Sequence, residues 1–104
     1  MIIVLTTVPD RALANTLADK LVSEKLAACV QILPEMESVY WWQDGIERAP
    51  EFLLLAKTTS DNFEMLEQEV RALHSYQTPE IIALPVTASS APYLEWLTAT
   101  VRSQ

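Results

Sequence analysis

Residues 28–59 place the strongest constraint on what this chain can fold into. Their sequence predicts two long β-strands joined by a tight turn at Asp44-Gly45, because Asp-Gly is a strong hairpin signal and glycine takes positive φ without steric cost. Gly45 is the only glycine among the 104 residues. Strands in globular proteins usually run about 5–6 residues. We therefore expect the extra length of these arms to have a use beyond forming a small sheet.

Proline interrupts both arms of the predicted hairpin. Pro34 and Pro50 cannot donate hydrogen bonds to a strand ladder, so bulges or edge positions are expected there. With a two-residue turn at Asp44-Gly45 and no bulge, the side chains of Cys29 and Lys57 would point to opposite faces. A bulge at either proline would reverse this, and the sequence leaves both geometries open.

The segments outside the hairpin predict two further strands and three helices. Asp10 is a good N-cap for an amphipathic helix over residues 11–25, and Asp61 with Glu64 predicts a capping box on the second helix. The two strands are expected over residues 2–7 and 80–86, and the third helix is expected to begin near residues 89–92. The order β-α-β-β-α-β plus a C-terminal helix predicts an α+β, ferredoxin-like sandwich forming a single domain, residues 1–104.

The predicted strands are apolar on both faces. Apolar residues occupy adjacent positions at 29–30, 32–33, 52–56 and 81–84, and adjacent side chains of a strand point to opposite faces of its sheet. Two helices cover one face only, so a monomer would leave a large apolar surface in water. We therefore expect a homo-oligomer in which this face packs against other copies.

Composition limits the partners and the location. Fourteen acidic against seven basic side chains give a net charge of −7, which would repel the phosphates of nucleic acid. No apolar run approaches the roughly 20 residues that span a membrane. The N-terminal segment MIIVLTTVPDR lacks a basic region and a cleavage site, so we expect a first strand and not a signal peptide. A single cysteine fits a reducing compartment, and a cytoplasmic location is expected.

Few side chains could support catalysis. One glycine excludes nucleotide-binding loops, and no HExxH or CxxC motif is present. Cys29 and His74 could form a nucleophilic pair, but a thiol in an apolar strand is usually inert packing. With no other acid–base pair in view, we expect a protein that is not an enzyme.

Metal binding is the alternative for the same side chains. Cys29 and His74 are ligand types used by zinc and copper, and Glu80 could add an oxygen. These are too few for a closed four-ligand site, so a site would need a subunit interface or water. The simpler interpretation of His74 is a loop residue whose hydrogen bonds order residues 74–80.

Lys57 ends the apolar run of the second arm. A lysine at a strand end usually extends to solvent. If it lay near Glu80, the pair would line a cleft and could contact an anion or another ligand. The aromatic residues of the chain are expected at packing positions and interfaces.

Several motifs, in their order along the chain, resemble the CutA family of divalent-cation-tolerance proteins. The matching segments are TTVPD (6–10), EKLAACV (24–30), Tyr-x-Trp (40–42), LLLAKTT (53–59), LHSYQTPEIIALPV (73–86) and YLEWL (93–97). The resemblance implies a ferredoxin-like subunit in a tight homotrimer, with long hairpin arms that reach onto neighbouring subunits. It also implies a role in divalent-cation tolerance, a metal-ion response with weak binding of Cu²⁺ or another divalent cation that folding does not require.

The resemblance also implies which residues form a site. The family's recurrent polar and aromatic residues fall on Cys29, Trp42, Lys57, His74, Tyr76, Pro79, Glu80, Tyr93 and Trp96. The candidate metal ligands are His74, Glu80 and Cys29. The candidate ligand-binding cleft contains Lys57, Tyr76, Trp42, Tyr93 and Trp96.

The chain departs from the family pattern at three positions. Ser75 replaces a proline that often follows the histidine, and Thr6 and Leu73 stand where some members have a cysteine and a second histidine. Because two soft or nitrogen ligands are missing, we expect copper binding to be weak. The alternative is a signalling-type trimer that binds a small ligand, such as an anion, or a partner between subunits and has no specific metal site.

Overall fold

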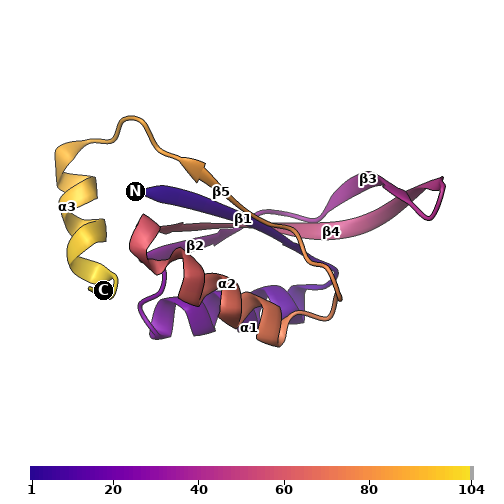
Figure 1. Ribbon diagram of the computed structural model, residues 1–104, viewed down its shortest axis with the longest axis horizontal. Helices are drawn as coiled ribbons and strands as arrows, with labels where there is room; N and C mark the ends of the chain where they lie inside the picture. The colour runs from indigo at the N-terminus through magenta and orange to yellow at the C-terminus, as the bar shows by residue number, and fades with distance from the viewer. Residues whose placement is uncertain (104) are drawn as a thin grey trace.

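The structure is a computed structural model that describes residues 1–103, and its centre is one antiparallel sheet (Figure 1). The elements in chain order are β1 (Ile2–Val8), α1 (Arg11–Ser23), β2 (Cys29–Ile32), β3 (Met36–Trp42), β4 (Gly45–Thr58), the 3₁₀ helix η1 (Ser60–Asn62), α2 (Phe63–Leu73), β5 (Ile81–Pro85) and α3 (Ala91–Thr100). Four of the five strands lie in the order β2-β4-β1-β5, and β3 pairs with the first half of β4. This is the expected arrangement, with the first arm of the hairpin divided into two strands.

Side-chain capping explains the start of α1, as predicted, but not the start of α2. The carboxylate of Asp10 accepts a hydrogen bond of 2.8 Å from the backbone N–H of Leu13, which caps α1. The capping box predicted from Asp61 and Glu64 is wrong, because the 3₁₀ turn of η1 leads into α2 instead. The side-chain amide of Asn62 donates to the hydroxyl of Thr59 and holds this turn.

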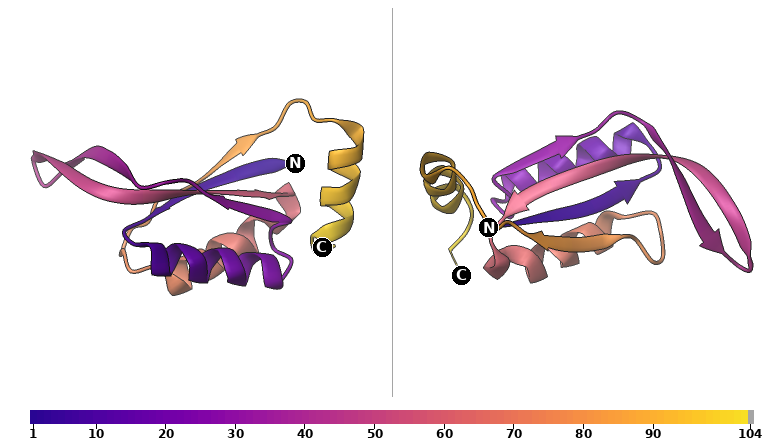
Figure 2. Two further views of the ribbon diagram at one scale, coloured as in Figure 1. Left: turned by 180° about the vertical axis from the view of Figure 1, so that it is seen from behind. Right: turned by 90° about the horizontal axis from the view of Figure 1, so that it is seen from above.

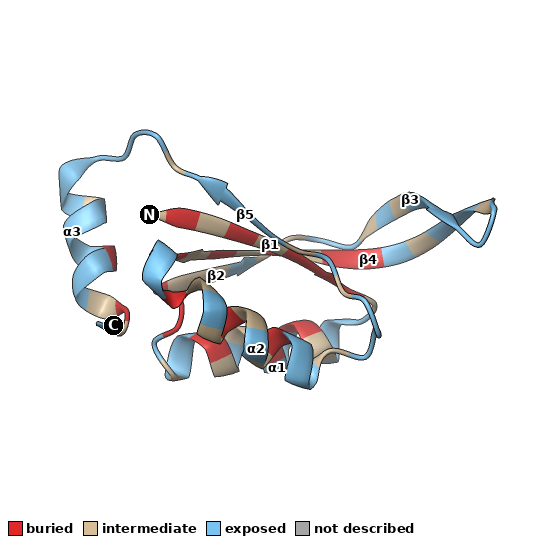
Figure 3. Cartoon of the chain, in the orientation of Figure 1, coloured by how far each residue is buried: buried red, intermediate tan, exposed pale blue. Residues whose placement is uncertain are grey.

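Helices α1 and α2 cover one face of the sheet and bury the main core against it (Figures 2 and 3). Alternate residues of β1 and β4 point to these helices, so the chain places apolar side chains there at period two. The largest fully buried core side chains are Val4, Val8, Leu17, Leu21, Leu26, Leu54, Leu66 and Val70. Helix α3 packs separately at one end of the sheet, where Leu97 and Val101 meet Ala28.

The opposite face of the sheet has no helix over it. Its side chains come from the alternate positions of the same strands, including Leu5, Leu55, Ile82 and Leu84. Ile82 and Leu84 on the edge strand β5 are 48% and 47% exposed in the single chain. We call this surface the open face.

The turn of the hairpin lies one residue earlier than predicted. Gln43 and Asp44 occupy the two turn positions with φ of 48° and 64°, and Gly45 pairs with Trp42 as the first residue of β4. A two-residue turn that matches strand twist needs positive φ at both positions, and Asp tolerates this region better than most residues. The prediction that Gly45 supplies the positive φ is therefore wrong.

A bulge near Pro34 decides which side chains share the open face. Ile32 pairs with Leu54 and Met36 pairs with Glu51, so three residues of one arm oppose two of the other. The extra residue changes the parity of β2 relative to β3. As a result Cys29 lies directly opposite Lys57, and both point to the open face.

Candidate functional site

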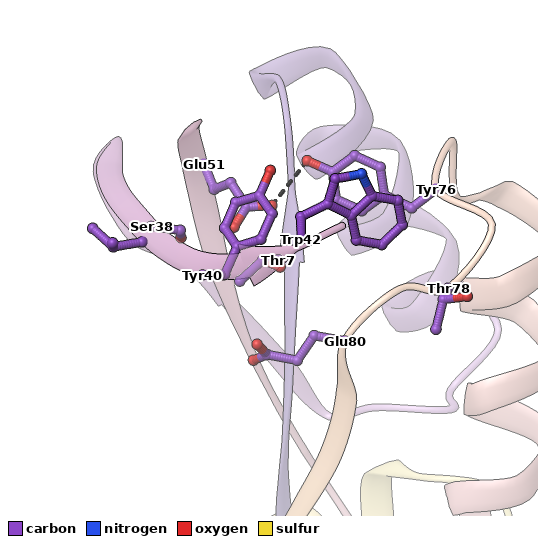
Figure 4. Close-up of a pocket in the computed structure, with 9 residues that line it drawn as sticks. Thr7, Ser38, Tyr40, Trp42, Glu51, Tyr76, Thr78 and Glu80 are labelled. Carbon is purple, nitrogen blue, oxygen red and sulfur yellow. Dashed lines mark hydrogen bonds between the residues drawn. The ribbon is translucent and has the colours of Figure 1, made fainter. Parts of the chain in front are cut away.

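A pocket of about 460 Å³ opens where the hairpin leaves the body of the molecule (Figure 4). Three elements build it: the end of β1, the β3–β4 hairpin, and the loop that connects α2 to β5. Most of its lining residues lie on the open face, on the hairpin face continuous with it, or on the loop between α2 and β5. The lining residues are Thr7, Ser38, Val39, Tyr40, Trp42, Glu51, Tyr76, Thr78 and Glu80.

Glu51 is the most deeply buried charged residue of this pocket. The residue is only 8% exposed, and its Oε2 accepts a hydrogen bond of 2.8 Å from the Tyr76 hydroxyl. Burial of the phenol, and next its hydrogen bond to Glu51, raise the pKa of Tyr76 to about 12. At neutral pH Tyr76 therefore keeps its proton and donates a hydrogen bond to the carboxylate.

His74 holds the loop that carries Tyr76. Its Nε2 lies 2.7 Å from the backbone oxygen of Thr7, which can only accept, so Nε2 carries the proton. Its Nδ1 accepts a hydrogen bond of 3.0 Å from the backbone N–H of Tyr76, and the two rings lie 4.7 Å apart. Both ring nitrogens are thus used in ordering the loop, which is the simpler of the two roles expected for this residue.

The pocket lining carries negative charge without a basic side chain. Glu51 and Glu80 are its two carboxylates, and no Lys, Arg or His is among the residues that line it. Within residues 1–103, the basic side chains in ion pairs contact Glu24 and Glu37, which lie outside the pocket. The site therefore favours cations over anions by simple electrostatics.

The remaining predicted residues gather at the other end of the open face. Lys57 Nζ lies 5.6 Å from the centre of the Tyr93 ring, and the rings of Tyr93 and Trp96 are 5.5 Å apart. Cys29 is opposite Lys57 across the β2–β4 ladder. Of the predicted cleft, this end contains Lys57, Tyr93 and Trp96, while the pocket contains Trp42 and Tyr76.

Within one chain, the pocket residues and the residues around Lys57 lie far apart. Lys57 and Glu51 are six residues apart on the extended strand β4, which corresponds to about 20 Å. Lys57 and Glu80 are consequently not a pair within the chain. No three His, Cys, Asp or Glu side chains among residues 1–103 are grouped to hold a metal ion. A copper site that combines Cys29 with His74 and Glu80 would need a second copy of the chain.

Sequence reasoning missed Glu51, Tyr40, Thr7, Ser38 and Thr78 as members of the pocket. Glu51 left a usable signal, because it shares strand parity with Lys57 and is a charged residue directly before an apolar run of the same strand. Thr7, Ser38 and Thr78 left no such signal in the sequence, because their place in the pocket depends on how the loop and the hairpin meet.

The family comparison covers nearly the whole chain. The CutA1 divalent ion tolerance protein family matches residues 2–100. A divalent-cation tolerance protein CutA from Thermus thermophilus is 48% identical over 95 residues, 91% of this chain and 92% of that protein. A solved structure of a Thermus thermophilus divalent cation tolerance protein has a TM-score of 0.95 at 46% identity, covering 98% of this chain and 100% of that one.

Other relatives carry names that differ in location. Rice protein CutA 1, named chloroplastic, is 45% identical over 101 residues, which are 97% of this chain and 57% of that protein. This chain therefore spans little more than half of the rice protein. The structure of an Archaeoglobus fulgidus protein, named a periplasmic divalent cation tolerance protein, has a TM-score of 0.94 at 39% identity over 98% of this chain and 100% of that one. Across residues 1–103, none of the helices has the length and apolar character needed to cross a membrane.

The resemblance inferred from the motifs is confirmed by both kinds of comparison. The family match extends across 2–100, and the fold agrees with these two solved members at TM-scores of 0.95 and 0.94. Because sequence and fold agree in this way, the chain belongs to the CutA1 divalent ion tolerance protein family.

Proposed function

We propose that this protein acts in divalent-cation tolerance as a non-enzymatic homotrimer that binds divalent cations weakly. The observation that supports this is that both Glu51 and Glu80 line one pocket that no basic side chain lines. One or two carboxylates completed by water hold hard divalent cations loosely. The apolar open face supports assembly, because a monomer would leave it in water. A cytoplasmic location is part of the proposal, supported by the single cysteine and testable by cell fractionation.

Calorimetric titration with Mn²⁺ and with Cu²⁺ tests the cation proposal. We expect weak binding in the wild type and a clear reduction in Glu80→Gln. His74→Ala, which loosens the loop before Glu80, should reduce the affinity less. Glu95→Gln is the matched control, since it removes the same charge from the exposed surface of α3, away from the pocket. Tight Cu²⁺ binding that disappears in His74→Ala would contradict the carboxylate site and support ligation by His74.

A second candidate is a trimer that holds a small anion or a partner between subunits and has no specific metal site. It is favoured by Lys57, which lies on the open face beside Tyr93 and makes no ion pair among residues 1–103. A thermal-shift screen with anions and nucleotides tests it, because a ligand of the native state must raise the melting temperature. The rise should vanish in Lys57→Gln and persist in Lys25→Gln, a lysine exposed elsewhere. An equal rise in both variants would contradict this candidate.

A further inference from the structure

We propose that the pocket beside the hairpin binds a small organic cation, a molecule with an ammonium or substituted ammonium group. The group would lie between the aromatic rings of Tyr40, Trp42 and Tyr76 and face the carboxylates of Glu51 and Glu80. This inference concerns the pocket of the proposed divalent-cation binding, but it rests on the rings, which a hydrated metal ion does not need.

The first argument is charge. Glu51 is more than nine-tenths buried, and its side chain has one hydrogen-bond partner among residues 1–103, the Tyr76 hydroxyl. Burying a carboxylate without a positive partner is costly, so a cation in the pocket would stabilise it. Glu80 adds a second negative charge to the same lining. An anionic ligand would meet two carboxylates and no compensating base.

The second argument is the aromatic lining. The faces of Trp and Tyr rings attract ammonium groups through the ring quadrupole. Tyr40 and Trp42 are alternate residues of β3, so both point to the pocket side of the hairpin. They are 43% and 56% exposed in the single chain, so residues 1–103 leave part of each side chain uncovered.

The third argument is the rigidity of the opposite wall. Tyr76 is fixed at three points: its hydroxyl donates to Glu51, its backbone N–H donates to His74, and its ring lies against the imidazole. A wall already held in place costs little ordering entropy when a ligand binds.

The fourth argument is size. A cavity of about 460 Å³ falls in the range of small-molecule sites, and it has far more room than a single metal ion uses. The hydroxyls of Thr7, Ser38 and Thr78 line the same space and could hydrogen-bond the remainder of the ligand. The dimensions and the mixed lining therefore fit an organic molecule.

Binding of tetramethylammonium to the full chain, followed by ligand-observed NMR, tests the proposal. tert-Butanol is the matched ligand control, since it has nearly the same shape and no charge. We expect saturable binding of tetramethylammonium only. Trp42→Leu should weaken it about twofold to fivefold, the loss typical of a cation–π contact at a partly exposed site.

Two protein controls make the result specific. Trp41→Leu removes an exposed tryptophan from the other face of the hairpin and should leave binding unchanged. Glu51→Gln should weaken binding. If this buried substitution prevents folding, Trp42→Leu still tests the proposal, because replacing an exposed side chain should leave the fold intact. Equal binding of the two ligands, no saturable binding, or equal effects of Trp41→Leu and Trp42→Leu would overturn the proposal.

The same variants separate this inference from the proposed metal binding. Trp42→Leu should leave Mn²⁺ binding unchanged, whereas Glu80→Gln should weaken it. Mn²⁺ binding without tetramethylammonium binding would reject the organic cation and keep the metal. The reverse result would reject the metal and keep the organic cation.

Discussion

At the scale of single residues, the contact between Glu51 and Tyr76 sets the character of the pocket. Burial of the phenol is the larger cause, and the hydrogen bond to Glu51 the second, of the rise in the pKa of Tyr76 to about 12. The folded protein holds this proton more tightly than the unfolded chain, where a tyrosine pKa is about 10. The resulting stabilisation is complete below about pH 10 and is lost as the pH rises towards about 12.

Replacing Glu51 by Gln should lower the pKa of Tyr76 only part of the way to about 10, because burial of the ring remains. The measurement is the tyrosinate absorbance during alkaline titration, with Tyr76→Phe used to assign the signal. An unchanged titration in Glu51→Gln would show that the carboxylate does not act on this phenol.

His74 permits a second prediction at this scale. His74→Ala removes the hydrogen bonds to the Thr7 carbonyl and from the Tyr76 N–H, and we expect a loss of about 1–3 kcal/mol in the free energy of unfolding. Amide hydrogen exchange at Tyr76 should become faster. Ser75→Ala, an exposed neighbour, is the control for chemical denaturation and exchange. Equal behaviour of the two variants would mean that His74 does not order the loop.

At the scale of elements, the bulge near Pro34 decides which side chains of the hairpin face the pocket. It allows Val30 and Ile32 to face the core while Tyr40 and Trp42 face the pocket. Without the extra residue, a register that kept Val30 and Ile32 in the core would turn the aromatic side chains of β3 to the other face of the hairpin.

The register set by this bulge can be tested with a disulfide. Lys57→Cys should form an intramolecular disulfide with Cys29, because residues directly opposite in an antiparallel ladder lie within bonding reach. Loss of both free thiols in a monomeric band on non-reducing gels is the expected result. Leu55→Cys, two residues away, should keep its thiol. Two free thiols in Lys57→Cys after oxidation would show that the register is different.

At the scale of the whole molecule, the open face accounts for the two-sided apolar strands. Helices α1 and α2 protect one face, and the other exposes apolar side chains of β5. The hairpin extends from the body along the longest dimension of 45 Å, so it has the reach to contact another copy.

Light scattering tests the proposed assembly. We expect the wild type to have three times the mass of the 11.7 kDa chain. Ile82→Asp should dissociate it, because a charge would be buried on the open face, whereas Glu95→Asp on the exposed surface of α3 should not. A wild type that stays monomeric at micromolar concentration would contradict the trimer.

The sequence by itself determined the order of elements, the cap at Asp10, the apolar core positions and the family. These are local or periodic properties, which helix capping, strand alternation and short motifs encode directly. It also predicted an interruption at Pro34, because proline cannot donate to a ladder.

Only the tertiary structure decided which predicted site residues meet. Trp42 and Tyr76 share a pocket with Glu80, whereas Cys29 and Lys57 lie at the other end of the open face. One extra residue at the bulge reverses the parity of a whole arm and so decides which side chains share a face. Such a single-residue shift leaves composition and periodicity unchanged, and the loop after α2 meets the hairpin only in the folded chain, so the pocket of Glu51 follows from the tertiary structure alone.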